Sequence, residues 1–350
     1  MKALVFNGPR DIRYERVAEP KIQNDRNLII KVNACSICGS DLHMYHGGHI
    51  GKVDYGKPML PFCTGHETVG EVVETGTAVL NHRVGDRILV APGSGCGQCR
   101  RCRAGQVNIC EKRQGIAYGI SANLQGGHAE YLEVRFADDG AATIPEGVTD
   151  EQALLLTDAL ATGYYGVKMA QVSPGDTVAV IGQGPVGLMA AEAAMAVGAA
   201  RVFTIDPVGY RRLPSTAFGA TALHPDDAGA VIKEATKGIG VDAVIEAVGA
   251  GPTVNQAIKL VRLGGRISVL GVLQADTPIP MHLAQQKSVM VHAGIAGVAA
   301  TWSELVPLVQ AGRIKGQGLF THRFSLSEGA EAFRLFDARE DQVVKILMKP

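Results

Sequence analysis

The fold of this chain is decided by residues 177–187, which read Thr177-Val178-Ala179-Val180-Ile181-Gly182-Gln183-Gly184-Pro185-Val186-Gly187. The first five residues form an uninterrupted apolar run, which is typical of a strand buried in a parallel sheet. The last six match G-x-G-x-x-G, and an alanine-rich segment that we expect to be helical follows from Leu188 to Val197. A strand, a glycine-rich turn and a helix N-terminus in this order can receive a pyrophosphate on backbone N–H groups. The motif therefore predicts a nucleotide site at Gly182, Gly184, Pro185, Val186 and Gly187.

An acidic residue follows this motif at the distance that a dinucleotide site needs. Asp206 stands at the end of the next expected strand, where a carboxylate can bind the ribose 2′-hydroxyl. A carboxylate there should repel a 2′-phosphate, so NAD is favoured over NADP. Arg211 and Arg212 follow closely and could soften this preference, or could simply lie on a solvated helix face.

Strands and helices alternate through the middle of the chain. After a helix expected over 153–168 and the strand 177–181, further strands are expected at 201–205, 241–245, 266–270 and 288–292. This alternation predicts an α/β unit with a doubly wound parallel sheet. The last part of the chain predicts helices near 302–311 and 327–336 and a closing strand at 343–348.

The first 160 residues have a different pattern. Short alternating runs such as Leu28–Val32, Thr68–Val73 and Arg87–Val90 are separated by glycine and proline. Strand-length runs between turn signals predict a mostly β domain with antiparallel or barrel-like packing.

Four of the seven cysteines crowd into one segment with the spacing Cys96-x2-Cys99-x2-Cys102-x7-Cys110. Thiolates at this spacing on a glycine-containing loop can converge tetrahedrally on zinc, which predicts a zinc lobe at about 93–113. An iron–sulfur cluster is the rival, but ferredoxin-type runs have a shorter last gap and a proline after the final cysteine. Four protein ligands leave no open position, so the predicted zinc is structural; four free thiols are the remaining alternative.

A second reactive cluster occurs in Cys38-Gly39-Ser40-Asp41-Leu42-His43, followed downstream by Gly65-His66-Glu67. Unlike reactive groups packed this closely are costly to bury unless a metal or substrate satisfies them. Catalytic zinc usually has three protein ligands and one exchangeable position, and Cys38 and His66 are two candidates.

The third ligand has several candidates. Glu67 is adjacent to His66, and Asp158 lies in an apolar segment where an acid needs a partner. His46 and His49 are alternatives, although a histidine in a glycine-rich loop is more often solvated.

Composition narrows the function classes. The formal net charge is zero, so no nucleic-acid or membrane-surface binding is expected, and small molecules are the expected partners. We expect no membrane span and no signal peptide, and hence a cytoplasmic protein. In a reducing cytosol, clustered cysteines indicate metal rather than disulfides.

The three sites, in this order, resemble those of the zinc-dependent medium-chain alcohol dehydrogenases. The resemblance covers essentially the whole chain and rests on Cys-x-Ser-Asp-x-His, Gly-His-Glu, the four-cysteine lobe and the G-x-G-x-x-G motif. It implies a GroES-like β domain at 1–160 plus 296–350 and a Rossmann domain at 161–295, with the active site in the cleft between them. It also implies a homotetramer.

The resemblance assigns roles to single residues. Cys38 and His66 match catalytic zinc ligands, and Asp158 falls where many members have cysteine, as in bacterial members that use aspartate. Glu67 matches a glutamate that in several relatives binds or leaves the zinc. The remaining matches are Ser40 and His43 with a proton relay, Asp41 with the carboxylate that orients the zinc-bound histidine, and Lys345 with a residue that reaches the cofactor pyrophosphate.

These features predict an enzyme that binds two zinc ions per chain and transfers a hydride between a small primary or secondary alcohol and NAD. Polyol, threonine-type and formaldehyde-type dehydrogenases are the nearest rivals, because they share the metal and nucleotide sites. A non-catalytic NAD-binding protein is the alternative from another class.

Overall fold

The computed structural model describes residues 1–47, 60–112, 117–120 and 124–350, and the chain divides into two compact units. Unit 1 comprises residues 1–161, 297–310 and 320–350, and unit 2 comprises residues 162–296 and 311–319. Segment 311–319 was predicted with the first unit. It belongs to unit 2 because the backbone N–H groups of Lys315 and Gly316 donate to the Glu192 carboxylate, at 2.7 and 3.1 Å.

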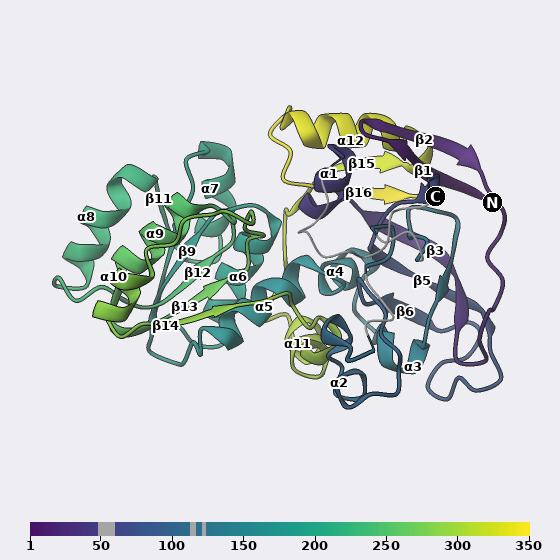
Figure 1. Cartoon of the computed structure of the whole chain (residues 1–350), viewed down its shortest axis with the longest axis horizontal. Helices are drawn as coiled ribbons and strands as arrows, with labels where there is room; N and C mark the ends of the chain where they lie inside the picture. Colours follow the sequence, from purple (N-terminus) through teal and green to yellow (C-terminus); the bar gives the residue numbers. More distant parts are fainter. Residues whose placement is uncertain (48–59, 113–116, 121–123) are drawn as a thin grey trace. The chain divides into compact units, whose positions relative to one another are not determined.

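Unit 1 contains two sheets (Figure 1). Its three-stranded sheet has the order β2-β1-β4, and its seven-stranded sheet has the order β15-β16-β3-β5-β6-β8, with β7 also paired to β3. Among the described strands of unit 1, only the β15–β16 pair is parallel, which agrees with the predicted antiparallel β domain. The strands are β1 Lys2–Gly8, β2 Asp11–Arg16, β3 Leu28–Ser36, β4 Phe62–Cys63, β5 Glu67–Thr75, β6 Arg87–Val90, β7 Tyr131–Val134, β8 Ala141–Thr143, β15 Phe320–Ser325 and β16 Lys345–Lys349.

Short helices complete this unit. They are α1 Gly39–Tyr45, α2 Arg100–Arg103, α3 Ala137–Gly140, α4 Asp150–Leu156, α11 Trp302–Gln310 and α12 Gly329–Ala338. Helix α5, Ala159–Met169, runs across the boundary between the two units in the sequence.

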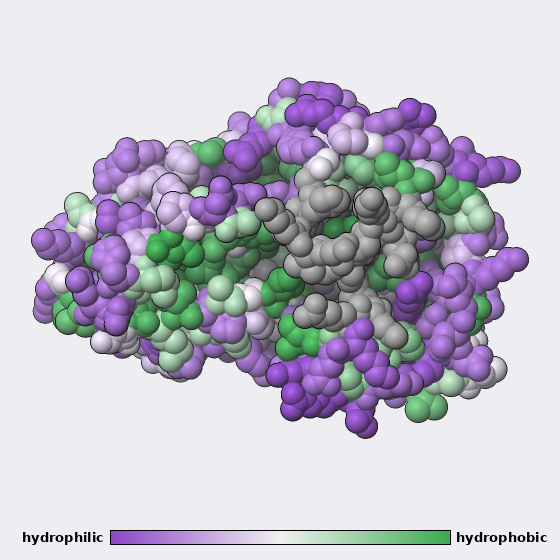
Figure 2. Space-filling model, viewed as in Figure 1, coloured by the Kyte–Doolittle hydropathy of each residue, from purple (hydrophilic) through white to green (hydrophobic). Residues whose placement is uncertain are grey.

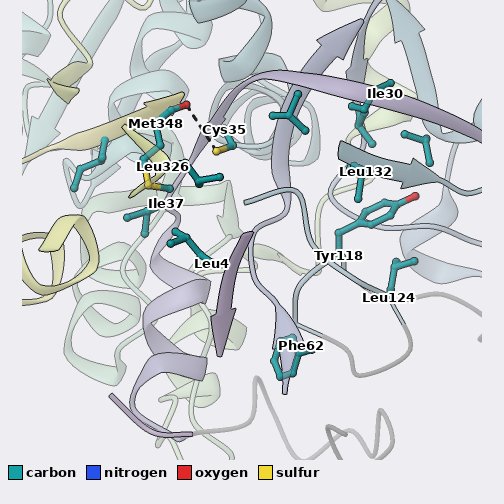
Figure 3. Close-up of a cluster of buried hydrophobic side chains, with 14 of the residues drawn as sticks. Leu4, Ile30, Cys35, Ile37, Phe62, Tyr118, Leu124, Leu132, Leu326 and Met348 are labelled. Atoms are coloured by element: carbon teal, nitrogen blue, oxygen red, sulfur yellow. Dashed lines mark hydrogen bonds between the residues drawn. The ribbon is translucent and has the colours of Figure 1, made fainter. Parts of the chain in front are cut away.

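The core of unit 1 draws side chains from both ends of the chain (Figure 3). Leu4 from β1, Ile30 from β3 and Met348 from β16 are fully buried in one cluster. The Cys35 thiol donates to the Met348 carbonyl at 3.7 Å, and β16 pairs with β3 at this point. The last strand of the chain is therefore built into the same sheet as the segment that leads to Cys38.

Unit 2 is a six-stranded sheet in which every pair is parallel, in the order β11-β10-β9-β12-β13-β14. The strands are β9 Thr177–Ile181, β10 Arg201–Ile205, β11 Thr221–Leu223, β12 Val241–Glu246, β13 Val261–Val269 and β14 Met290–Ala293. The helices are α6 Pro185–Ala196, α7 Gly209–Thr216, α8 Pro225–Ala235, α9 Gly251–Leu260 and α10 Met281–Gln286. The order reverses direction beside β9, so the glycine motif after β9 lies at the topological switch point, where α/β sheets bind ligands.

One predicted helix is wrong in its length. Residues 153–168 were expected to be continuous, but α4 ends at Leu156 and α5 begins at Ala159. The Thr157 hydroxyl donates back to the Leu154 carbonyl at 2.7 Å, and the Trp302 indole N–H donates to the Leu156 carbonyl at 2.9 Å. These two side chains occupy carbonyls that a continuous helix would use, so Asp158 lies at a break between helices.

The surface of unit 2 includes several apolar side chains among the hydrophilic ones (Figure 2). Met290 on the edge strand β14 is 49% exposed, and Met281 is 53% exposed. Among the described residues, no helix has the length and apolar character needed to cross a membrane.

Candidate metal and cofactor sites

Four potential metal ligands from three segments of unit 1 lie together. One donor atom from each of Cys38, His66, Glu67 and Asp158 lies within 4.8 Å of all the others. The Cys38 sulfur and the His66 Nε2 lie 3.1 and 3.4 Å from Asp158 Oδ2. Tetrahedral zinc with bonds of about 2.0–2.3 Å separates its ligands by roughly 3.3–3.8 Å. The His66–Asp158 separation lies in this range and the Cys38–Asp158 separation is slightly shorter, so small side-chain movements would bring Cys38, His66 and Asp158 onto one zinc ion.

Asp41 determines which nitrogen of His66 faces this set. Its Oδ1 lies 3.2 Å from His66 Nδ1, and its Oδ2 accepts the Cys38 backbone N–H at 2.9 Å. Burial alone would raise the pKa of Asp41, but His66 outweighs it and lowers the pKa below its ordinary value. A carboxylate on Nδ1 leaves Nε2 as the nitrogen available to a metal. The orienting role of Asp41 toward a bound zinc stays a prediction.

The pKa of the Cys38 thiol also bears on metal binding. Burial, and then the Asp158 carboxylate, raise the pKa of Cys38 to about 11. A thiolate ligand at neutral pH therefore needs a positive ion beside it, which zinc would supply.

His128, which no sequence pattern indicated, supports the backbone before His66. His128 is fully buried; its Nε2 donates to the Ser36 carbonyl at 3.0 Å, and its Nδ1 accepts from the Thr64 hydroxyl at 2.9 Å. Gly65 has a φ of +96°, and a Cβ there would lie 2.3 Å from the imidazole. Only glycine fits between this histidine and His66.

Glu67 is held by Lys345. The Lys345 ammonium lies 2.8 Å from Oε1 and 2.6 Å from Oε2, and the two side chains are 1% and 0% exposed. Burial alone would lower the pKa of Lys345, but Glu67, together with Cys38 and Asp158, outweighs burial and raises the pKa. Burial also raises the pKa of Glu67, although the Lys345 ammonium acts in the opposite direction. The sequence signal for this contact was a lone lysine in an apolar strand, since a buried charge requires a partner. The predicted contact of Lys345 with the cofactor pyrophosphate stays a prediction.

The predicted relay residues lie on α1. The Ser40 hydroxyl is 3.2 Å from His66 Nε2, so it faces the ligand set. His43 is three residues further along the same helix face, with much of its side chain open to solvent. Partial burial of its ring, and then His46, lower its pKa. His46, the alternative ligand, lies 2.7 Å from Asp337 rather than in the ligand set, and His49 lies outside the described residues.

The four clustered cysteines converge as predicted, on a loop around α2. The Cys102 sulfur lies 3.5 Å from that of Cys99 and 4.0 Å from that of Cys96, against about 3.8 Å expected for tetrathiolate zinc. Cys110 belongs to the same set. Backbone N–H groups, first that of Cys102, lower the pKa of the Cys99 thiol to about 6. A Cβ on Gly95 would lie 2.3 Å from the Cys102 sulfur, so glycine is needed for the convergence.

The glycines of the nucleotide motif have different functions in unit 2. A Cβ on Gly187 would lie 1.8 Å from the Gly182 carbonyl oxygen, and Gly182 itself has a φ of +90°. These two glycines let β9 and α6 join closely. A Cβ on Gly184 would meet no protein atom within 4 Å, so this glycine leaves open space at the N-terminus of α6. Such space beside backbone N–H groups fits a phosphate.

Asp206 follows β10 and lies beside this motif. Its Oδ2 accepts the Gln183 N–H and its Oδ1 accepts the Val208 N–H, each at 2.8 Å. Arg212 donates to the Asp206 and Pro207 carbonyls at 2.6 and 3.0 Å. Arg211 lies over the Tyr210 ring at 5.9 Å. The carboxylate is therefore fixed against the glycine turn. Its contact with a ribose hydroxyl stays a prediction.

Comparison with known proteins gives matches to both units. Two family models match, "Alcohol dehydrogenase GroES-like domain" over residues 24–146 and "Zinc-binding dehydrogenase" over residues 185–311. The chain is 38% identical, over 100% of its length and 89% of the relative, to the "Probable zinc-binding alcohol dehydrogenase" of Mycobacterium tuberculosis. It is 32% identical to the sorbitol dehydrogenase of Bacillus subtilis, covering 100% of this chain and 97% of the relative.

Solved structures give the same result. Alcohol dehydrogenase TADH from Thermus sp. ATN1 has a TM-score of 0.92 and 34% identity, over 100% of this chain and 99% of that chain. The 2R,3R-butanediol dehydrogenase from Bacillus subtilis has a TM-score of 0.86 and 31% identity, and the match covers 100% of this chain and 99% of that chain. These matches confirm the predicted fold.

Removing one ligand from the cysteine lobe should remove one zinc. We expect Cys110→Ser to lower the zinc content by one ion per chain and to lower the unfolding temperature, because a structural zinc contributes folding free energy. Zinc analysis by atomic absorption and thermal unfolding test this. Cys63→Ser is the control, since Cys63 is equally buried but lies outside the cluster. An unchanged zinc content in Cys110→Ser would contradict the assignment.

Two glycine variants separate folding from cofactor binding. Gly184→Ala should keep the unfolding temperature of the parent but weaken NADH binding by about tenfold or more, because its methyl group enters the open space. Gly187→Ala should lower the unfolding temperature through its collision with Gly182. Fluorescence titration with NADH and thermal unfolding are the measurements. An NADH affinity in Gly184→Ala equal to that of the parent would contradict a phosphate site beside Gly184.

Proposed function

The chain belongs to the zinc-dependent medium-chain alcohol dehydrogenases, and on that premise we propose that it oxidises small alcohols or polyols with NAD and reduces the matching carbonyl compounds. We further propose two zinc ions per chain, a catalytic ion on Cys38, His66 and Asp158 and a structural ion on the four clustered cysteines. The observation that carries the proposal is the set of three ligand atoms in unit 1 with the Ser40 hydroxyl directed at it. The homotetramer stays a prediction.

The range of substrates follows the named relatives. They include a sorbitol dehydrogenase and a butanediol dehydrogenase, both of which act on polyhydric alcohols by name. We expect segments 44–62 and 118–124 to line the substrate pocket. Residues 48–59 and 121–123 lie outside the described residues, so no single alcohol is proposed. Screening primary, secondary and vicinal alcohols while following the absorbance of the reduced cofactor would define the class.

The chemistry divides between the bound groups and the side chains. Zinc would make the substrate hydroxyl more acidic, and the nicotinamide would accept the carbinol hydride. Ser40 then takes part in removing the hydroxyl proton, because its Oγ lies beside the ligand set. His43, three residues along α1 and exposed, passes the proton to solvent. Asp41 keeps the His66 ring in the orientation that leaves Nε2 for the metal.

The preference for NAD is supported by Asp206. Its carboxylate is only 6% exposed and is fixed by two backbone N–H groups, so it cannot turn away from a ribose phosphate. Arg212 is held on backbone carbonyls, which reduces its capacity to attract a second anion. We therefore propose NAD as the cofactor, with Arg211 as a second contact.

Ser40→Ala should lower kcat by about 10²-fold while both zinc ions and NADH affinity stay unchanged, since general acid–base groups contribute roughly this much. Steady-state kinetics, zinc analysis and NADH titration are the measurements. Ser327→Ala, an exposed serine of unit 1, is the matched control. Near-normal turnover in Ser40→Ala would exclude the relay.

Asp206→Asn should raise the ratio of kcat/KM for NADP to that for NAD by at least about tenfold, because the substitution removes the charge that repels a 2′-phosphate. Initial rates with both cofactors at one alcohol concentration measure the ratio. Glu234→Gln removes an exposed charge from α8 and should leave the ratio unchanged. The same ratio in Asp206→Asn and the parent would contradict the role of Asp206.

A further inference from the structure

The Glu67–Lys345 pair is the most deeply buried ion pair among the described residues. Its partners are 278 positions apart in the sequence, at the first residues of β5 and β16. Strand β3 lies between these two strands and pairs with both, and its Ser36 is opposite Glu67 on one side and Leu347 on the other. Strand β16 thus places the Lys345 ammonium group beside the proposed metal ligands.

The Glu67 carboxylate lies beside two possible cationic partners, the Lys345 ammonium and a metal ion held by the other three ligands. One of its oxygens lies within 4.8 Å of the Cys38, His66 and Asp158 donor atoms, close enough to join them on a metal after a small side-chain movement. Both oxygens also lie within 2.8 Å of the Lys345 ammonium. A carboxylate that remains on the ammonium leaves the metal three protein ligands, whereas one that moves to the metal supplies the fourth.

We infer that Lys345 is a positioning residue that holds Glu67 off the metal and so preserves the exchangeable position where the substrate oxygen binds. The charges agree with this arrangement. With a metal bound, the Cys38 thiolate and the Asp158 and Glu67 carboxylates would carry three negative charges, which the divalent ion and the Lys345 ammonium would balance. This inference rests on the proposed function, because it requires a metal on Cys38, His66 and Asp158.

Without Lys345 the Glu67 carboxylate is buried with no ammonium beside it. Such a group must either take up a proton or bind the metal, because an uncompensated buried charge is strongly unfavourable. If it binds the metal, the fourth position closes. The two outcomes differ in metal affinity and in access for an added ligand.

The experiment uses protein with cobalt in place of zinc and imidazole as the probe of the open position. Imidazole reports only the catalytic site, because the four-cysteine site has no open position. In Lys345→Met we expect imidazole to bind at least about tenfold more weakly. We also expect cobalt to resist a competing chelator at least about tenfold better. Residues that hydrogen-bond to metal ligands have effects of this size on metal affinity. Lys345→Arg should restore the parent values.

Controls separate the inference from the proposed function. Lys349→Met, at the exposed end of β16, should match the parent. If the parent responds to imidazole but Lys345→Met has the same imidazole and cobalt affinities, the inference is wrong and the proposed function stands. If cobalt in the parent does not respond to imidazole, the proposed function fails and the inference fails with it.

A second variant covers the case in which Lys345→Met does not fold. Glu67→Gln in the parent background should keep imidazole affinity within about twofold, because Glu67 is not a resting ligand. A change of tenfold or more in Glu67→Gln would show that Glu67 already binds the metal, and would overturn the inference.

Discussion

The structure of unit 1 depends on one electrostatic constraint, the convergence of three acidic groups in a buried space. Cys38, Asp158 and Glu67 come from three distant segments, and their donor atoms lie within 4.8 Å of one another and of His66. Burial makes their charged forms unfavourable unless cations compensate them. Lys345 supplies one positive charge, and zinc would supply the other two. The zinc ion that would compensate these buried charges is also the ion that would make the substrate hydroxyl more acidic, and Lys345 would keep its fourth position open.

The scaffold around this set fixes its geometry through the backbone. The break between α4 and α5 places Asp158 beside Cys38 at the start of α1. His128 packs where Gly65 has no side chain, which fixes the strand start that carries His66 and Glu67. In unit 2, glycine has a comparable function, since Gly187 allows close joining of β9 to α6 and Gly184 leaves space for a ligand. In both units, glycine occurs where another group lies against the backbone: the His128 ring at Gly65, the Gly182 carbonyl at Gly187 and, we propose, a phosphate at Gly184.

Sequence patterns predicted most of the fold because the periodic segments are long and apolar. The strands 177–181 and 201–205 have the predicted bounds, and the four-cysteine spacing predicted a convergence that the structure contains. What the patterns missed depends on tertiary contacts. Trp302 ends α4 from 146 positions away, and Lys345 pairs with Glu67 across 278 positions. Local sequence carries no record of such partners, although a lysine within an apolar strand does show that a partner is needed.

Anomalous X-ray diffraction at the zinc absorption edge locates each zinc ion and its ligands in one measurement, and so tests the assignment of both metal sites. We expect two peaks per chain. One should lie among the four clustered cysteines, and the other among Cys38, His66 Nε2 and Asp158, with Glu67 on Lys345. A single peak at the cysteine cluster, or a second peak away from Cys38 and His66, would contradict it.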